Sequence, residues 1–136
     1  MKAPFLRSPS HARLAACYCV ALSACAPMIA TVPSAIEAKQ PSVAARRIQI
    51  LIDTTVQLDT GYSRPLPERS VWSRVGRVPQ GDVYRPIGTI LTIEGRQVHE
   101  AYLVIRDKTL VGFYLPGEQN YSPLSTAVPL NLGESE

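Results

Sequence analysis

The sequence predicts an all-β domain over residues 46–136, folded as a small antiparallel sandwich or a partly open barrel of about six or seven strands. Three observations lead to this expectation. Apolar and polar residues alternate with a period of two, short apolar runs are separated by Gly and Pro, and no convincing helical periodicity occurs within the domain. So short a sheet must bury one face on itself, which favours a sandwich or a barrel.

The first expected strand runs over 48–58. Its even positions are apolar except for Thr54, and its odd positions are polar except for Leu51. This pattern is typical of a strand with one buried face and one face in water, so we expect one long strand or two strands joined by a bulge. The residues that follow, 60–70, contain one glycine and two prolines and are expected to form a loop.

The remaining strands are short apolar runs bounded by turn residues. We expect strands over 71–78, 87–93, 98–105 and 109–115, with turns at 79–82, 94–97 and 106–108. The last three strands have short connections and predict an antiparallel meander. After a loop over 116–123, renewed alternation predicts a closing strand over 124–132, which Pro123 and Pro129 place at a sheet edge.

The residues before the domain have a different composition. Residues 1–13 carry Lys2, Arg7 and Arg13 and no acid, and an apolar run over 14–24 follows. That run is too short to cross a bilayer, which takes about 20 apolar residues. A charged lead, a short apolar stretch and small residues are together typical of a secretory signal peptide.

The apolar run ends in Leu22-Ser23-Ala24-Cys25, which resembles the lipobox of bacterial lipoproteins. The resemblance covers only this N-terminal part and implies nothing about the domain. In that family the Cys thiol receives a diacylglyceryl group and the chain is cut just before the Cys. The resemblance therefore implies a signal peptide over 1–24 and lipid attachment at Cys25. Because Ala26 is not acidic, it also implies the outer membrane as the destination.

Two other interpretations of this segment stay open. The first is ordinary secretion with a cut at an A-x-A site, here Ala24-Cys25-Ala26, although Pro27 directly after the cut fits such a site poorly. The second is a retained helix. The lipid anchor is favoured physically because two or three acyl chains give stable membrane attachment.

A tether is expected between the anchor and the domain, so that residues 25–45 comprise the lipidated Cys and a Pro/Ala/Ser-rich linker. Pro27, Pro33 and Pro41 interrupt any helix there. The alternative is a short helical turn over 34–39 that packs on the domain.

Processing changes the charge and the cysteine content. The whole chain has a formal charge of +3, and three of its 14 basic residues precede Cys25, so 11 basic residues remain against 11 acidic ones. A neutral domain gives no reason to expect nucleic-acid binding. Cys17 and Cys19 leave with the signal peptide and Cys25 carries lipid, so we expect no disulfide.

No residue pattern predicts catalysis, a cofactor or a metal. His99 and Glu100 are neighbours on an expected strand, so their side chains point to opposite faces and cannot act together. Acid–base catalysis needs a second positioned group, and none is evident near His99 in the sequence. We therefore expect a protein that is not an enzyme, with His99 bound to a backbone carbonyl or to water.

A basic and aromatic segment over 61–86 is the best candidate for a partner contact. Arginine and large aromatic residues dominate interface hot spots, and the candidate contact residues here are Trp72, Arg74, Arg77, Tyr84 and Arg85. Trp72 and Arg74 have the same parity, so they can lie side by side on one sheet face. The alternative is that Trp72 belongs to the core and that the arginines pair with acids.

These expectations combine into one functional hypothesis. The protein is an outer-membrane lipoprotein, held by lipid on Cys25 and facing the periplasm, whose β domain is a non-catalytic binding or adaptor module. Its partner is another envelope protein or the cell-wall glycan. Two alternatives stay open: an inhibitor that inserts loop 116–123 or loop 61–70 into a hydrolase, and a structural subunit of a secretion or conjugation complex.

Overall fold

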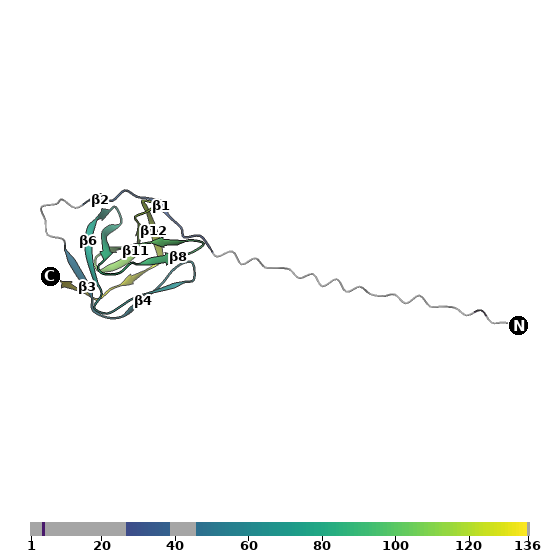
Figure 1. The fold of residues 1–136 in the computed structure, drawn as a ribbon, viewed down its shortest axis with the longest axis horizontal. Coiled ribbons are helices and arrows are strands. Elements are labelled where there is room, and N and C mark those ends of the chain that lie inside the picture. The colour runs from purple at the N-terminus through teal and green to yellow at the C-terminus, as the bar shows by residue number, and fades with distance from the viewer. Residues whose placement is uncertain (1–3, 5–26, 39–45, 136) are drawn as a thin grey trace.

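The computed structural model describes residue 4 and residues 27–38 and 46–135 (Figure 1). The expectations for the signal peptide and for Cys25 lie outside these residues. The described part is all-β and contains no helix, which confirms the predicted fold class. Accordingly, it has no helix of the length and apolarity needed to span a membrane.

The described residues form thirteen strands, more than the six or seven predicted. They are β1 (Val32–Pro33), β2 (Glu37–Ala38), β3 (Arg47–Ile50), β4 (Thr54–Gln57), β5 (Ser63–Leu66), β6 (Val71–Val78), β7 (Gly81–Pro86), β8 (Thr92–Glu94), β9 (Val98–Glu100), β10 (Tyr102–Arg106), β11 (Thr109–Leu115), β12 (Asn120–Pro129) and β13 (Leu132–Ser135).

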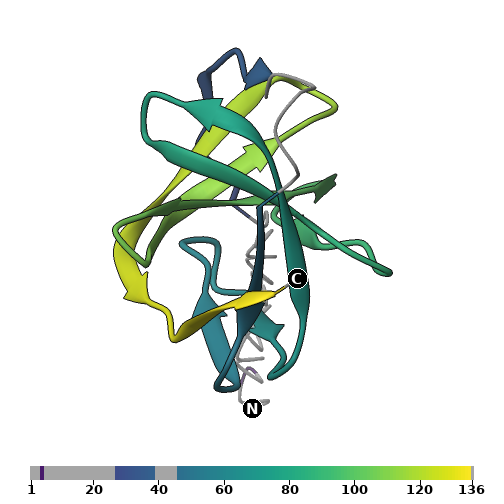
Figure 2. The same ribbon diagram turned by 90° about the vertical axis from the view of Figure 1, so that its left-hand side faces the viewer.

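Nine of these strands form one antiparallel sheet, in the order β1-β12-β11-β10-β7-β6-β3-β13, with β2 paired to β6 beside this path. Only Leu130 and Asn131 separate β12 from β13, although the two strands lie toward opposite ends of that order. The sheet must therefore curl strongly, as Figure 2 shows. It is not closed into a barrel, because no described pairing joins its two ends.

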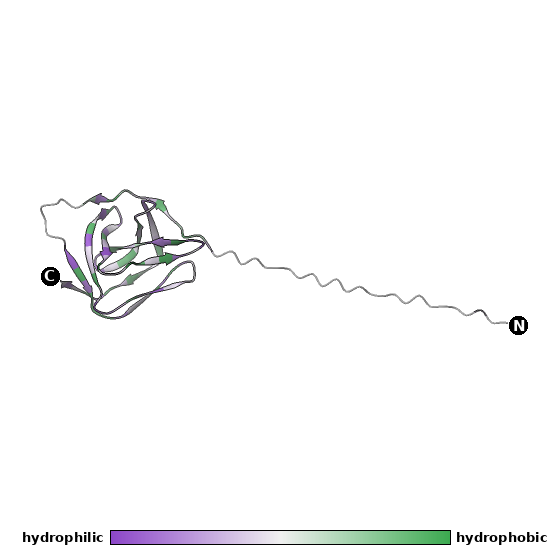
Figure 3. Cartoon of the chain, in the orientation of Figure 1, coloured by the Kyte–Doolittle hydropathy of each residue, from purple (hydrophilic) through white to green (hydrophobic). Residues whose placement is uncertain are grey.

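Two hairpins, β4–β5 and β8–β9, complete the sandwich-like fold. The main core lies between them and one face of the curled sheet. It joins Val56, Leu66 and Ile93 of the hairpins to Trp72 and Phe113 of the sheet. Hydrophobic and hydrophilic positions are mixed along single strands (Figure 3), as strands with two different faces require.

A second apolar cluster occupies the other face of the sheet. Its buried members are Val78, Val83, Val104, Tyr114 and Tyr121. A bulge in β6 between Arg74 and Gly76 reverses the parity of that strand, so Trp72 and Val78 point to opposite faces. Both faces of this sheet therefore carry apolar side chains that need to be covered.

The N-terminal residues 27–38 pack on the domain and so differ from the expected tether: Ile29 packs against the main core, and Ile36 covers part of the second face. β1 pairs with β12 and β2 pairs with β6, while Ile36 packs against the second cluster. Two glycines allow this close approach. A Cβ atom at Gly76 would lie 2.4 Å from the Glu37 carbonyl oxygen, and one at Gly95 would lie 2.8 Å from that of Pro27. The alternative of a helical turn is also wrong for 34–38; residues 39–45 lie outside the described part.

The expected strand over 48–58 divides into β3 and β4, which belong to different sheets. The backbone N–H of Ile50 donates to the Ser70 carbonyl at 3.0 Å, and that of Leu51 donates to the Asn131 carbonyl at 2.9 Å. After these bonds the chain leaves the large sheet and pairs with β5. Alternation continues across the break because both parts have one buried face.

Other boundaries also differ from the expectations. β7 occupies residues 81–86, which overlap the turn expected over 79–82. Of the strand expected over 87–93, only the end is present, as β8, and Ile87 and Ile90 before it are exposed. The meander consists of β10, β11 and β12, while β8 pairs only with β9. β5 lies in the expected loop over 60–70, whereas β6 and β11 have the predicted bounds.

Candidate functional site

The aromatic members of the predicted contact patch are in the core. Trp72 is 2% exposed and Tyr84 is 5% exposed, and both belong to the main cluster. The indole Nε1 of Trp72 donates to Ser70 Oγ at 3.1 Å. Burial raises the pKa of Tyr84, and the Asp82 carboxylate adds to this effect. These two rings are therefore not available as surface anchors.

Two arginines of that patch are engaged by one carboxylate. Arg74 Nη2 lies 3.0 Å from Asp82 Oδ1, and Arg77 Nε lies 3.5 Å from the same oxygen. In the register of β6 with β7, Arg74 lies opposite Tyr84, and the exposed Arg85 lies opposite Ser73. The fold thus brings Arg74, Arg77 and Asp82 together and separates them from the solvent-facing side chain of Arg85. This arrangement agrees with the alternative to the contact patch, in which Trp72 belongs to the core and arginines, here Arg74 and Arg77, pair with an acid.

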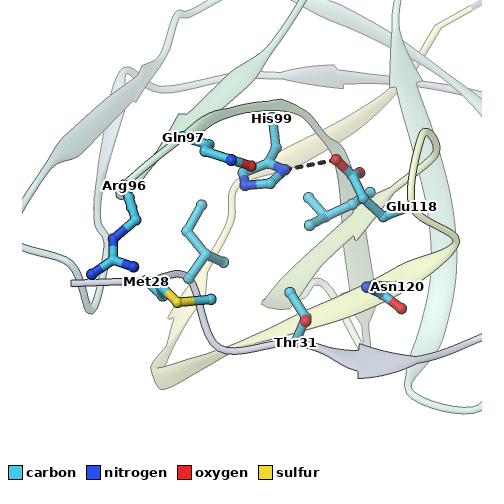
Figure 4. A pocket seen from close by; sticks show the side chains of 9 residues that line it. Met28, Thr31, Arg96, Gln97, His99, Glu118 and Asn120 are labelled. Carbon is cyan, nitrogen blue, oxygen red and sulfur yellow. Dashed lines mark hydrogen bonds and ion pairs between the residues drawn. The ribbon is translucent and has the colours of Figure 1, made fainter. Parts of the chain in front are cut away.

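A different set of residues, both polar and apolar, forms a hollow of about 250 Å³. It lies where three segments meet: the N-terminal residues 28–31, the tip and second strand of the β8–β9 hairpin, and the turn between β11 and β12 (Figure 4). Its lining consists of Met28, Ile29, Thr31, Arg96, Gln97, His99, Leu115, Glu118 and Asn120. We call this hollow the His99 pocket.

A hydrogen-bond contact between the side chains of His99 and Glu118 forms one wall of the pocket. His99 Nδ1 lies 2.8 Å from Glu118 Oε1, and the two side chains are 17% and 42% exposed. The register of β9 with β8 places His99 opposite Ile93 and so fixes the position of His99 in the hairpin. Glu118 belongs to the turn over 116–119, where Gln119 has a φ of 53°. The partner expected for His99 was a backbone carbonyl or water, and the structure provides a carboxylate.

The pocket is suited to binding a small polar group. Arg96, Gln97 and Asn120 can donate hydrogen bonds, Glu118 can accept them, and Met28 supplies an apolar surface. Its volume lies below the roughly 300–1,000 Å³ of sites for drug-sized ligands, so it fits a side chain or part of a sugar. Within residues 27–38 and 46–135, no group of three His, Cys, Asp or Glu could hold a metal ion.

The sequence did not reveal this pocket. Glu118 and His99 are 19 residues apart, and Met28 is far from both along the chain. No local spacing links these segments, because β-sheet pairing over long range brings them together.

The loops that were considered for insertion into an enzyme are tied to the domain. Glu118 binds His99 and the Gln119 carbonyl accepts a hydrogen bond from the Ser34 N–H at 3.0 Å. In the other loop, residues 63–66 form β5, and Arg64 Nε donates to the Thr92 carbonyl at 2.7 Å. Both segments thus help to hold the N-terminal residues and the β8–β9 hairpin in place.

Comparison of the chain with protein-family models, with curated proteins and with solved structures gives no match.

Proposed function

We propose that this protein is a lipid-anchored outer-membrane lipoprotein whose small β domain is a non-catalytic binding module facing the periplasm. The observation that carries the proposal is Leu22-Ser23-Ala24-Cys25 behind a basic lead and a short apolar run. Because the described chain packs on the domain from Pro27 onward, a mature chain that begins at Cys25 would join the domain after a single intervening residue.

The binding site of the module is the His99 pocket. It combines exposed donors, a carboxylate and an apolar surface, whereas Trp72 and Tyr84 of the 61–86 segment are buried. The ligand is a polar group of an envelope component, either a side chain of another envelope protein or a unit of the cell-wall glycan. The donors of Arg96, Gln97 and Asn120 and the carboxylate of Glu118 support binding as the activity of the pocket.

Replacement of Cys25 by Ala tests the anchor. The variant should lose labelling by a fatty-acid analogue and keep the mass of the unprocessed chain, because the thiol that accepts lipid is absent. Cys19→Ala is the matched control and should leave labelling unchanged, because Cys19 lies in the segment that is removed. A Cys25→Ala protein that still matures to the same length and stays on membranes contradicts the proposal.

Capture of partners from an envelope extract tests the pocket. The mature full chain should retain a protein or a glycan, and mass spectrometry or sugar analysis identifies which. His99→Ala and Glu118→Ala should each reduce the captured amount at least about tenfold, the loss expected for one charge-assisted hydrogen bond. Arg85→Ala is the control. Loss of the partner in Arg85→Ala together with full retention in His99→Ala would assign binding to the 61–86 segment.

A further inference from the structure

One end of the domain is formed by three segments that lie together. Thr60 Oγ1, in the β4–β5 turn, donates to the Glu94 carbonyl at 2.8 Å, which joins the tips of the two hairpins. The Pro27 carbonyl lies against Gly95 in the β8–β9 turn, and residues 28–30 border the β4–β5 turn in a second hollow. We call the surface formed by residues 27–29, 58–62 and 94–98 the β8–β9 end (Figure 1).

Apolar, aromatic and basic side chains are exposed at this end, together with the polar Asp59 and Gln97. Met28 is 69% exposed, Val98 is 64% exposed and Tyr62 is 42% exposed, so this end presents apolar surface to solvent. Arg96 is exposed between them, and it takes part in no ion pair with the described residues.

The carboxylates at the β8–β9 end are already bound. Glu94 forms an ion pair with Arg64, and Asp59 accepts hydrogen bonds from the backbone N–H and the hydroxyl of Ser125, the latter at 2.6 Å. Asp59 keeps its negative charge in these hydrogen bonds to neutral groups, whereas Arg96 is a basic side chain of this end that no described carboxylate pairs, and its guanidinium can bind a phosphate group. Tyr and Arg beside apolar side chains are also the residues that favour the interface of a bilayer.

The length of the chain before Pro27 limits how far this end can lie from lipid on Cys25. Only Ala26 separates the two residues, and a step of two residues spans at most about 7 Å. The headgroup layer on each side of a bilayer is about 5–8 Å thick. With its acyl chains inserted, Cys25 thus holds Pro27 and its neighbour Gly95 at the level of the headgroups.

We propose that the domain lies directly on the membrane that holds its lipid, with the β8–β9 end against the phospholipid headgroups. This inference rests on the proposed lipid anchor and adds the orientation of the domain. Met28, Tyr62 and Val98 contact the boundary between headgroups and acyl chains, and Arg96 contacts lipid phosphate. The His99 pocket shares Met28 and Arg96 with this surface, so a ligand binds beside the bilayer.

Fluorescence quenching by lipid tests the orientation. The lipidated full chain with Val98→Cys or Arg96→Cys is labelled with a bimane dye; Cys25 is blocked by its lipid, so the introduced thiol alone reacts. The protein is reconstituted in vesicles of phosphatidylethanolamine and phosphatidylglycerol that carry a spin label on the headgroup. Glu134→Cys is the control, since the C-terminal strand lies at the opposite side of the domain in Figure 1.

The dye at either position of the β8–β9 end should be quenched at least about twofold more than the dye at Glu134, because interfacial groups lie within about 5–10 Å of the acyl boundary. Equal quenching at all three positions, in protein that floats with the vesicles and carries lipid, overturns the orientation and leaves the anchor intact. Protein that carries no lipid on Cys25 and does not float overturns both proposals. Two labelling positions guard against a local effect of the dye.

Discussion

Trp72 is held in the core by packing and by its hydrogen bond to Ser70. Removal of so large a buried side chain leaves a cavity that its neighbours fill only partly. Trp72→Ala should therefore lower the free energy of unfolding by about 3–5 kcal/mol, a large part of the 5–15 kcal/mol typical of a domain. Urea denaturation followed by circular dichroism measures this change.

The exposed Arg85 provides the contrast at the same scale. Arg85→Ala should change the free energy of unfolding by less than about 0.5 kcal/mol, as is usual for a surface position. A Trp72→Ala protein as stable as Arg85→Ala would mean that the indole ring is not buried.

Three buried tyrosines make the stability depend on alkaline pH. Burial raises the pKa of Tyr84, Tyr114 and Tyr121 above the ordinary value of 10.0. Above pH 10 the unfolded chain loses these phenolic protons first, so stability is complete below that pH and falls as pH rises through the folded-state pKa values. The free energy of unfolding, measured by urea denaturation between pH 9 and pH 12, should decrease over this range.

Tyr121→Phe is the informative variant for this effect. Its hydroxyl donates to the Val111 carbonyl at 3.0 Å, so the variant loses about 1 kcal/mol near neutral pH. It should also show a shallower loss of stability above pH 10, because one titrating group is gone. An unchanged slope would show that the Tyr121 hydroxyl titrates as it does in the unfolded chain.

At the scale of single elements, the N-terminal strands depend on two glycines. Any Cβ at Gly76 would collide with the backbone of Glu37, and one at Gly95 would collide with that of Pro27. Gly76→Val and Gly95→Val should displace residues 27–38 and leave the rest of the sheet folded. Amide hydrogen exchange should then become at least about tenfold faster in β1 and β2 and stay slow in β11.

Gly117→Val is the matched control for these variants. Gly117 has open space where a Cβ would be placed, so exchange in residues 27–38 should not change. If exchange in β1 and β2 is as slow in Gly76→Val and Gly95→Val as in the control, the segment does not depend on this close approach.

The bulge in β6 shows why a strand could be predicted while its faces could not. The bounds 71–78 follow from the apolar run, and the structure confirms them. A period-two pattern assigns Trp72, Arg74 and Val78 to one face, but the extra residue before Gly76 moves Val78 to the other face. Such a bulge is decided by pairing with β7, which was itself not predicted.

For the whole molecule, stability rests on burial and backbone pairing. The cysteines of the chain, Cys17, Cys19 and Cys25, all precede residue 27, so the described domain contains none. A reducing agent should therefore leave the thermal unfolding midpoint of the mature protein unchanged, measured by circular dichroism with and without dithiothreitol. A fall in the midpoint would reveal a disulfide and contradict lipid attachment at Cys25.

The all-β class and the bounds of β6 and β11 could be predicted because alternation and turn residues are local properties of the chain. The arrangement of the strands could not. Residues 48–58 alternate in polarity with only Leu51 and Thr54 as exceptions, yet β3 and β4 join different sheets. The pattern records that one face is buried, and it does not record which neighbour buries it.

The candidate site was even less accessible to prediction. His99 could be placed at the margin of an apolar face, but its contact with Glu118 requires the β8–β9 hairpin to meet the turn after β11. Conversely, Trp72 and Tyr84 were candidates because of their residue types, and only packing showed that they are buried.

By itself, the sequence determined that the domain is built from strands, and it predicts a lipoprotein signal in the residues before the domain. Both patterns are local in the sequence: one is the alternation of polarity, and the other is a basic lead followed by an apolar run and a cysteine. Only the tertiary structure decided that residues 27–38 belong to the sheet and that His99 meets Glu118. These contacts join distant segments, and they form because the apolar faces of a curled sheet must be covered from both sides.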